Sequence, residues 1–335
     1  MNETAFLEAL ARYSPEVRSA FIAAVQDVTD NAVLARVVEA LEAGDVDRAW
    51  RSLGVQQSVF NRLASALTSV FERHAATAMA FIPQRTVEGI KVRFNIRDPE
   101  AERWLREQSS TLVTRVTEEM RENVRAVATE GLAQGRNPRS TALDIIGRLD
   151  PSTGHREGGV VGLTTQQEQW SRSLRENLMS LSDGYFDMEL RDKRFDATVA
   201  EAIRTGKPLP ADTVQKLVDR YRANALRHRG EQIARTETLT AMNRAEYESV
   251  RQAMAQGDHP PEATTKVWKT ASDGRVRHTH AALHNVRVPF REAFVTPRGN
   301  RMMHPGDTSL GAPGAEVIAC RCRVFYDTDW TYGVR

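Results

Sequence analysis

Residues 98–135 read DPEAERWLREQSSTLVTRVTEEMRENVRAVATEGLAQG, and this stretch predicts one long amphipathic helix. Asp98 offers a capping side chain, Pro99 suits the first helical position, and Glu100 adds early negative charge. Apolar residues then recur in one stripe: Leu105, Leu112, Val116, Met120, Val124 and Val127. A helix that ends near Gly135 would be roughly 50 Å long at ~1.5 Å per residue. We therefore expect an elongated helical body.

The helical pattern extends over most of the chain before Gly257. Ser14 and Pro15 have the form of a helix start, and Thr165 with Glu168 has the form of a capping box. The alternation over 89–96 favours a strand or an extended linker. The remaining predicted helices span 59–81, 142–149, 165–178, 195–204 and 211–256.

Beyond Gly257, turn residues and short apolar segments replace the helical stripe. The fold class that follows is mainly α, an elongated helical body with a small C-terminal α+β domain. The predicted divisions are an N-terminal helical region (1–150), a helical region with a long helix (160–257) and the small α+β domain (258–335).

Composition limits the classes of protein that fit the chain. Of its 335 residues 41% are hydrophobic and 27% charged, as in a soluble folded protein, and the formal charge of +2 gives no global attraction to nucleic acid or membrane. The acidic N-terminus lacks a signal-peptide pattern, and the longest apolar run, over 75–82, is too short to span a membrane. We therefore expect synthesis in the cytosol and no membrane partner.

Two histidines and two cysteines form the densest candidate site. If 278–284 is helical, His280 and His284 share one face. If 320–326 is a strand, Cys320 and Cys322 point to the same side. Two imidazoles and two thiolates suit tetrahedral zinc, although the spacing is not that of a standard zinc finger.

The sequence favours the alternative to zinc, in which the cysteines pack as small hydrophobic residues and the histidines hydrogen-bond loop carbonyls. In both interpretations we expect the four side chains to lie close together. A structural zinc ion is the second interpretation.

Motifs for catalysis are missing. Ala281 stands where a zinc protease helix needs a glutamate base. The chain has no G-x-S-x-G nucleophile motif, no G-x-x-x-x-G-K phosphate loop and no dinucleotide-binding G-x-G-x-x-G. We therefore predict no enzyme, with a metal-dependent nuclease that uses the His/Cys domain as an alternative.

Charged residues around the candidate site allow a second alternative, a DNA-binding accessory module. Arginine pairs well with phosphate. A structural salt-bridge cluster or a solvated surface is the more usual role of such side chains. The residues concerned are Asp273, Arg275, Arg277, Arg321 and Arg323.

The order of motifs resembles the phage head morphogenesis family of Mu F-like minor head proteins. The resemblance covers roughly residues 160–326 and is strongest after 231. In place of the family's frequent Gly and Asn, this chain has Asn285 and Ala319. The matching elements are Gly162-Leu-Thr164, Ala234-Arg-Thr-Glu237, Asn243, Trp268, Asp273-Gly-Arg-Val-Arg277, His280, Phe294, Pro305-Gly-Asp307, Glu316 and Cys320-Arg-Cys322.

The resemblance implies a minor structural protein of a tailed-phage head. Such a protein is assembled in the host cytoplasm and lies inside the virion head near the portal. It implies as partners the portal protein, capsid or scaffold proteins, and double-stranded DNA. The implied role is in head morphogenesis and in DNA packaging or delivery.

Overall fold

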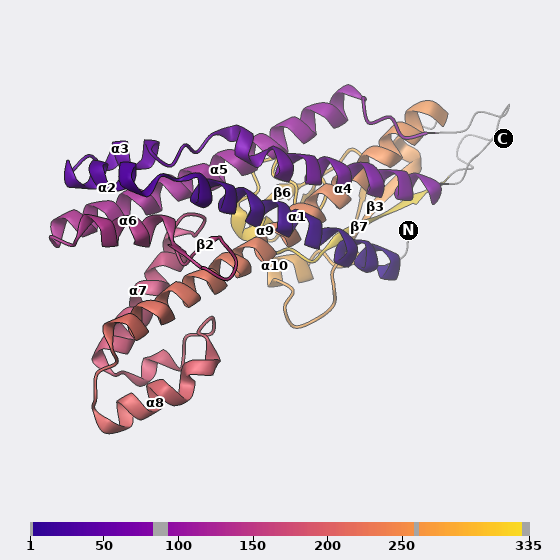
Figure 1. Ribbon diagram of the computed structural model, residues 1–335. Coiled ribbons are helices and arrows are strands. Elements are labelled where there is room, and N and C mark those ends of the chain that lie inside the picture. The colour runs from indigo at the N-terminus through magenta and orange to yellow at the C-terminus, as the bar shows by residue number, and fades with distance from the viewer. Residues whose placement is uncertain (1–2, 83–92, 258–260, 330–335) are drawn as a thin grey trace, which may run out of the picture. The chain divides into compact units, whose positions relative to one another are not determined.

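The computed structural model describes residues 3–82, 93–257 and 261–329, and within these ranges the chain is mainly helical (Figure 1). The α-helices are α1 (Glu3–Asn31), α2 (Leu34–Glu42), α3 (Val46–Arg51), α4 (Asn61–Ala80), α5 (Pro99–Ala133), α6 (Pro138–Ile146), α7 (Thr165–Ser180), α8 (Asp196–Thr205), α9 (Ala211–Gly257), α10 (His278–Ala281) and α11 (Gly314–Val317). Short 3-10 turns lie at Gln57–Phe60, Asp183–Tyr185, Lys193–Phe195 and Pro261–Ala263.

The described strands are few, short and antiparallel. One pair precedes α7, and the other strands follow α9, so the prediction of a mainly α fold with mixed structure at the C-terminal end is confirmed. The strands are β1 (Arg148–Leu149), β2 (Arg156–Glu157), β3 (Thr264–Lys269), β4 (Arg287–Pro289), β5 (Phe294–Val295), β6 (Arg301–Met302) and β7 (Arg323–Thr328).

Helix α5 forms as its sequence predicts. The Asp98 carboxylate accepts the backbone N–H groups of Glu100 at 3.0 Å and Ala101 at 3.4 Å, which caps the start of the helix. The whole predicted apolar stripe is buried. Helix α9 also occupies the predicted span, and Gly206 ends α8 in the left-handed conformation.

The first helix start was wrong. Pro15 lies inside α1, and the Ser14 hydroxyl donates to the Leu10 carbonyl at 2.8 Å and caps nothing. Tyr13 and Val17 are buried on both sides of the proline, so tertiary packing keeps the helix continuous through it.

Two other helix starts were displaced along the sequence. The capping box is formed one residue earlier, where the Thr164 hydroxyl accepts the Gln167 N–H and the Gln167 side chain accepts the Thr164 N–H. Helix α6 begins at Pro138 because Asn137 caps it, ahead of the predicted residue 142. Of the predicted strand or linker at 89–96, residues 89–92 lie outside the described ranges.

The chain divides into two compact units, each built from segments far apart in sequence. Unit 1 comprises Met1–Ser19, Leu63–Ser109 and Glu231–Arg335; unit 2 comprises Ala20–Arg62 and Ser110–Gly230. The divisions predicted at 1–150, 160–257 and 258–335 follow the chain order, whereas these units combine distant segments. Among the described residues, no helix has both the length and the apolar character needed to cross a membrane.

In unit 2, a buried ion network lies beside an apolar core that includes Leu174, Tyr185 and Val218. The Arg222 guanidinium binds both oxygens of Glu168, at 3.1 and 2.8 Å. A second carboxylate, that of Asp144, lies 3.5 Å from Arg222 and also binds Arg148. We call Asp144, Arg148, Glu168, Asp219 and Arg222 the arginine network.

In unit 1, β3, β4 and β7 form a three-stranded antiparallel sheet of order β4-β3-β7, of which Figure 1 labels β3 and β7. Trp268 of β3 lies opposite Val324 of β7. Trp268 and Phe294 belong to the core cluster that also holds both cysteines and Leu239 of α9. The later part of α9 therefore packs directly against the segment that carries the candidate site.

Glutamine side chains of α9 replace a strand partner for the residues before α5. The Gln252 amide accepts the Asn95 N–H at 2.7 Å and donates to the Asn95 carbonyl at 3.0 Å. Gln256 makes the same pair of bonds with Arg93, at 3.1 and 2.9 Å. Because the two glutamines are one helical turn apart, they satisfy a short extended backbone without a sheet.

Candidate functional site

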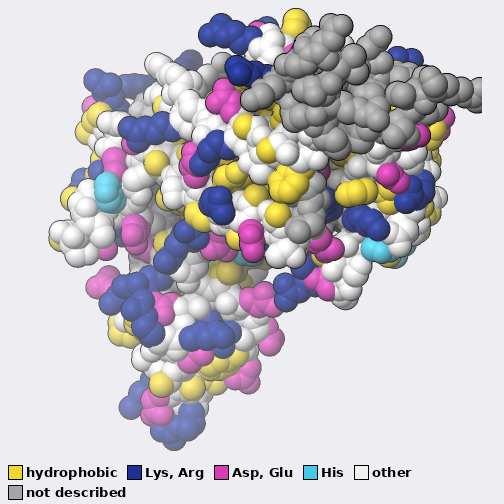
Figure 2. All heavy atoms as spheres, turned by 90° about the vertical axis from the view of Figure 1, so that its right-hand side faces the viewer, with side chains coloured by type: hydrophobic (Ala, Val, Ile, Leu, Met, Phe, Trp, Pro, Cys, Tyr) yellow, Lys and Arg dark blue, Asp and Glu magenta, His cyan; other side chains and the backbone are white. Residues whose placement is uncertain are grey.

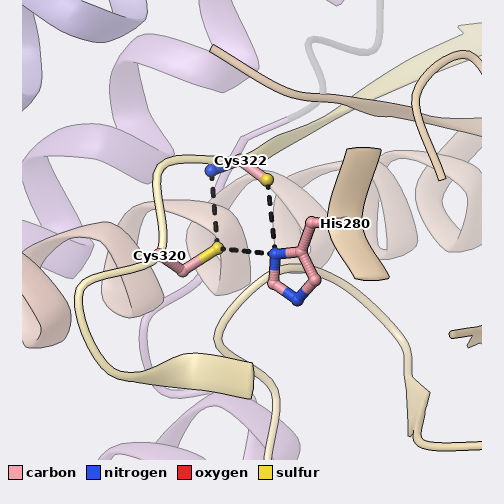
Figure 3. Close-up of side chains that lie close together, drawn as sticks. All are labelled: His280, Cys320 and Cys322. Carbon is pink, nitrogen blue, oxygen red and sulfur yellow. Dashed lines mark hydrogen bonds between the residues drawn. The ribbon is translucent and has the colours of Figure 1, made fainter. Parts of the chain in front are cut away.

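Three of the four predicted ligand residues meet in the interior of unit 1. The Nδ1 atom of His280 lies 3.5 Å from the sulfur of Cys320 and 3.5 Å from the sulfur of Cys322 (Figure 3). Each of the three side chains is 1% exposed. Their ligand atoms all lie within 4.8 Å of one another. Within the described ranges, no other set of three or more His, Cys, Asp or Glu side chains comes together in this way. We call these three residues the His/Cys cluster.

Glu316 lies at the opposite edge of the His280 ring. One of its carboxylate oxygens is 3.0 Å from Nε2, although the atoms are not aligned as a good hydrogen bond. The same carboxylate accepts the Thr279 hydroxyl and the Asn300 amide, each at 2.9 Å. The buried carboxylate is thus fixed, and it favours a ring whose proton is on Nε2 and whose Nδ1 faces the sulfurs.

The long helix α9 holds the cysteine loop in place. Its Thr236 hydroxyl accepts the Ala319 N–H at 2.9 Å, directly before the first cysteine. Its Asn243 amide donates to the Cys322 carbonyl at 3.3 Å and accepts the Val324 N–H at 3.2 Å. The loop is therefore fixed at both ends by side chains of one helix.

The loop also bends back on itself. The Cys322 N–H donates to the Cys320 sulfur at 3.4 Å, which brings both sulfurs to one side without a strand (Figure 3). On the other side, the buried Trp268 indole packs edge-on against the His280 ring, with 5.2 Å between ring centroids. Aromatic packing and the bent loop together leave the cluster little freedom to move.

Close contact makes the acidities of the two thiols interdependent. The hydrogen bond from Cys322, assisted by His280, holds the pKa of Cys320 well below its ordinary value although burial opposes this. The same bond, with burial and the adjacent charge, raises the pKa of Cys322. Burial also opposes a low pKa at Glu316, but the Thr279 and Asn300 bonds keep it below the usual range. The first thiol proton is therefore lost easily and the second is retained.

The fourth predicted ligand lies elsewhere. Helix α10 ends at Ala281, so His284 does not share a helix face with His280. His284 is exposed, and its Nδ1 faces the Thr270 hydroxyl at 2.8 Å. The cysteines were also predicted on a strand, but β7 begins only at Arg323. We predicted that one helix face would bring the two histidines together and one strand the two cysteines. Both elements were wrong, because α10 ends before His284 and β7 begins after Cys322.

The five charged residues around the site have different surroundings. Arg323 is 6% exposed and stacks over the Phe6 ring at 5.0 Å. Arg277 donates to the Glu316 and Ile318 carbonyls, and Arg321 pairs with Asp273. Arg275 is exposed, and its backbone N–H donates to the Asp273 carboxylate at 3.1 Å.

Two turns at the site need the left-handed backbone conformation. Asn285 has φ 66° and Ala319 has φ 54°. The family that the sequence resembles often has Gly and Asn at these two positions, and both residue types tolerate this conformation. The two departures noted in the sequence therefore fall on positions where the backbone restricts residue choice.

Several side chains that support the site were not predicted as site residues. Glu316, Thr236 and Asn243 act through hydrogen bonds to the His/Cys cluster or its loop. A polar residue inside a helical stripe gives no indication of such distant partners. The sequence signal that pointed to these three residues was their position among the motifs that resemble the family.

Cys320 contacts His280, and His280 contacts Glu316. This order is also that of a nucleophile, a base and an orienting carboxylate. Two observations oppose this interpretation. The Cys320 thiol is buried, so a substrate cannot approach it in this conformation. The imidazole also faces both sulfurs equally, which does not single out one nucleophile. The arrangement suits internal hydrogen bonding or a metal ion.

Fold and site together define a helical protein whose C-terminal segment is organised around a buried His/Cys cluster. Residues 193–325 match the family described as Phage Mu protein F like protein, which confirms the predicted resemblance and makes this region Mu F-like. The matched residues contain the His/Cys cluster, Glu316 and the whole of α9, while Gly162-Leu-Thr164 lies before them. Neither the curated proteins nor the solved structures gave a match.

Proposed function

We propose that this chain is a minor structural protein of a tailed-phage head that acts in head morphogenesis and in DNA packaging or delivery. It would lie inside the virion head near the portal, after assembly in the host cytoplasm. Its proposed partners are the portal protein, capsid or scaffold proteins, and double-stranded DNA. The observation that carries the proposal is the Mu F-like match over residues 193–325.

The positions that resemble the family support this proposal because they serve one structural purpose. Thr236 and Asn243 fix the cysteine loop, Glu316 faces His280, and Trp268 covers the ring. Gly306 lies so close to α9 that an added Cβ would stand 2.3 Å from the Thr240 hydroxyl oxygen. Residues that all hold the same loop and ring in place suit a structural component of a particle better than a catalyst.

Charge distribution favours a structural role over bulk DNA binding. On the face that Figure 2 shows, Lys and Arg side chains alternate with Asp and Glu, and hydrophobic side chains form small groups between them. A protein that condenses DNA needs a field of one sign. The intermingled charges on this face and the formal charge of +2 fit specific protein contacts better.

Deletion of the gene in a phage that encodes the chain tests the proposal. We expect capsid shells to form while packaged DNA or infectivity falls, and a plasmid copy to restore both. Mass spectrometry of purified virions should find the chain at low copy number. Unchanged virion yield, DNA content and infectivity would overturn the proposal.

The portal association has its own test. The portal protein of the same phage is co-expressed with this chain, and the complex is isolated by size-exclusion chromatography. Co-elution that survives moderate salt supports the association. Separate elution, together with absence of the chain from purified heads, would contradict it.

The alternative functions are separated by one incubation. Purified protein is mixed with plasmid DNA and Mg²⁺, Mn²⁺ or Zn²⁺. We expect no cleavage, in line with the missing catalytic motifs. Cleavage lost in His280→Ala would instead indicate a nuclease, and salt-sensitive retention of DNA without cleavage would indicate a DNA-binding module.

A further inference from the structure

We propose that the His/Cys cluster binds one zinc ion through Nδ1 of His280 and the sulfurs of Cys320 and Cys322. Zinc commonly takes imidazole and thiolate ligands in tetrahedral structural sites. The site would be structural, and its role does not depend on the head-protein function proposed above.

The distances in the cluster match those around a zinc ion. Zn–N bonds of about 2.0–2.1 Å and Zn–S bonds of about 2.3 Å, at a tetrahedral angle of about 109°, place nitrogen and sulfur about 3.5–3.6 Å apart. The two nitrogen–sulfur separations in this protein are both 3.5 Å. Both nitrogen–sulfur distances therefore fit one shared ion, and all three ligand atoms lie within 4.8 Å of one another.

Hydrogen bonding alone explains the equal distances less well. A ring nitrogen has a single lone pair or a single proton, directed along one line in the ring plane. It can point at one sulfur or between two, but it cannot make two good bonds. Figure 3 shows Nδ1 of His280 directed towards both sulfurs, which is the arrangement of ligands around a common centre.

The surroundings of the cluster are those of metal ligands. Glu316 lies 3.0 Å from Nε2 of His280, the place at which a ligating histidine usually meets a carboxylate. The Cys322 N–H donates to the Cys320 sulfur, as it would to a ligating thiolate. Nε2 of His280 and the Trp268 indole N–H are both buried without a well-aligned hydrogen-bond partner.

Three protein ligands leave one tetrahedral position. Within the described ranges no further His, Cys, Asp or Glu joins the ligand group. We therefore infer that a water oxygen completes the coordination. Three protein ligands and a water are also the ligand set of catalytic zinc, but the burial of all three residues closes this site to a substrate, so we infer a structural role. His284 is exposed and bonded to Thr270, so it is not a ligand.

The test uses the full chain, purified from zinc-supplemented cells under reducing conditions and without chelators. Elemental analysis should give about one zinc per chain. X-ray absorption at the zinc edge should show two sulfur neighbours at about 2.3 Å and two light neighbours at about 2.0–2.1 Å. Reconstitution with Co²⁺ should produce the sulfur-to-cobalt charge-transfer band of a thiolate site.

Variants separate ligands from neighbours. His280→Gln, Cys320→Ser and Cys322→Ser should lose the zinc, whereas His284→Gln, the matched control four residues on, should retain it. Glu316→Gln should still bind zinc at saturation but with 10–100-fold weaker affinity, as for other outer-shell partners. If a ligand variant fails to fold, the wild-type metal content and cobalt spectrum still decide.

Three results would overturn the proposal. The first is wild-type protein that, after reconstitution with Zn²⁺, holds less than about one ion per ten chains. The second is a Cys320–Cys322 disulfide in protein isolated from reducing cells. The third is iron or copper at full occupancy in protein from zinc-supplemented cells, which would reject zinc as the metal.

Discussion

The arginine network and the His/Cys cluster are both buried polar groups, but they are completed in different ways. In the network, the Arg222 guanidinium faces the carboxylates of Glu168 and Asp144, so opposite charges from the chain meet directly. In the cluster, the Nδ1 atom of His280 lies 3.5 Å from each of two sulfurs, and we propose that a zinc ion binds all three atoms. The network is thus neutralised by charges of the chain itself, whereas in our proposal the cluster takes its cation from solution.

Metal removal should produce the largest difference between the His/Cys cluster and the arginine network. If zinc contributes on the order of 10 kcal/mol, as at structural sites, chelation should abolish stable packing around the cluster. Hydrogen exchange should then rise in peptides from 264–328, while peptides from 165–222 keep their protection. Readdition of zinc should reverse the change. Equal loss of protection in both sets of peptides would break the comparison.

The reverse perturbation is Arg222→Met. This change removes the buried cation of Glu168 and leaves Asp144 with Arg136 and Arg148 alone, and it should lower the unfolding free energy by about 3–5 kcal/mol. The control is Arg220→Met on the same helix. The Arg220 side chain is 44% exposed and lies 3.7 Å from Asp192, so it should contribute about 1 kcal/mol or less. Denaturant unfolding measures both variants, and zinc content should stay unchanged. Equal losses would show that burial of the network does not matter.

Acid should destabilise unit 1 through a second buried histidine, His304. Burial lowers the pKa of His304 from 6.5 to about 4, so the folded chain keeps it neutral where the unfolded chain binds a proton. Stability is therefore full above about pH 6.5 and declines by up to about 3 kcal/mol as the pH falls towards 4. Denaturation of zinc-loaded wild type and His304→Gln across this range should show a smaller slope in the variant. Parallel slopes would contradict the assignment.

Backbone fit near the site gives a smaller effect. In Gly306→Ala, the new Cβ would meet the Thr240 hydroxyl oxygen at 2.3 Å in a residue with φ +85°. The control Gly299→Ala has a similar φ of +80° but open space around it. We expect Gly306→Ala to cost about 1–3 kcal/mol more than the control, the usual cost of overpacking. Thermal unfolding of the two variants measures this difference.

The smallest expected effect is a gain. Ala319 adopts φ 54° directly before Cys320, a conformation that costs an ordinary residue about 1–2 kcal/mol and Asn less. Ala319→Asn should therefore raise the unfolding free energy by about 0.5–1 kcal/mol. The opposite change, Asn285→Ala at φ 66°, should lower it by a similar amount. A loss of stability in Ala319→Asn would show that side-chain space at this turn outweighs the backbone.

The regular helices could be predicted because their signals are local. The apolar stripe of α5 and its Asp98 cap lie within a few residues of one another, as do the end of α8 and Gly206. Pro15 shows the limit, since contacts from distant segments keep α1 continuous where the local pattern predicts a start. Of the four predicted ligands, His280, Cys320 and Cys322 lie together, whereas His284 bonds to Thr270.

The site geometry depends on contacts that no short-range pattern contains. His280 faces cysteines forty residues later, and Thr236 and Asn243 hold their loop from another helix. Periodicity assigned the cysteines to a strand and the two histidines to one helix face. In the folded chain, a bent loop and not a strand brings the two sulfurs to one side. Helix α10 ends at Ala281, so His284 does not share a helix face with His280.

The composition of unit 1 has a consequence for the order in which the chain folds. Phe6 is buried beneath the guanidinium of Arg323, and Met1–Ser19 packs in the same unit as Glu231–Arg335. At about 5–20 residues per second, the apolar face of the first helix therefore waits tens of seconds on the ribosome for its partners. Unit 2 has all its segments once Gly230 has emerged, so it can form while unit 1 is still incomplete. During that interval Met1–Ser19 and Leu63–Ser109, the parts of unit 1 already synthesised, lack the partners that Glu231–Arg335 supplies.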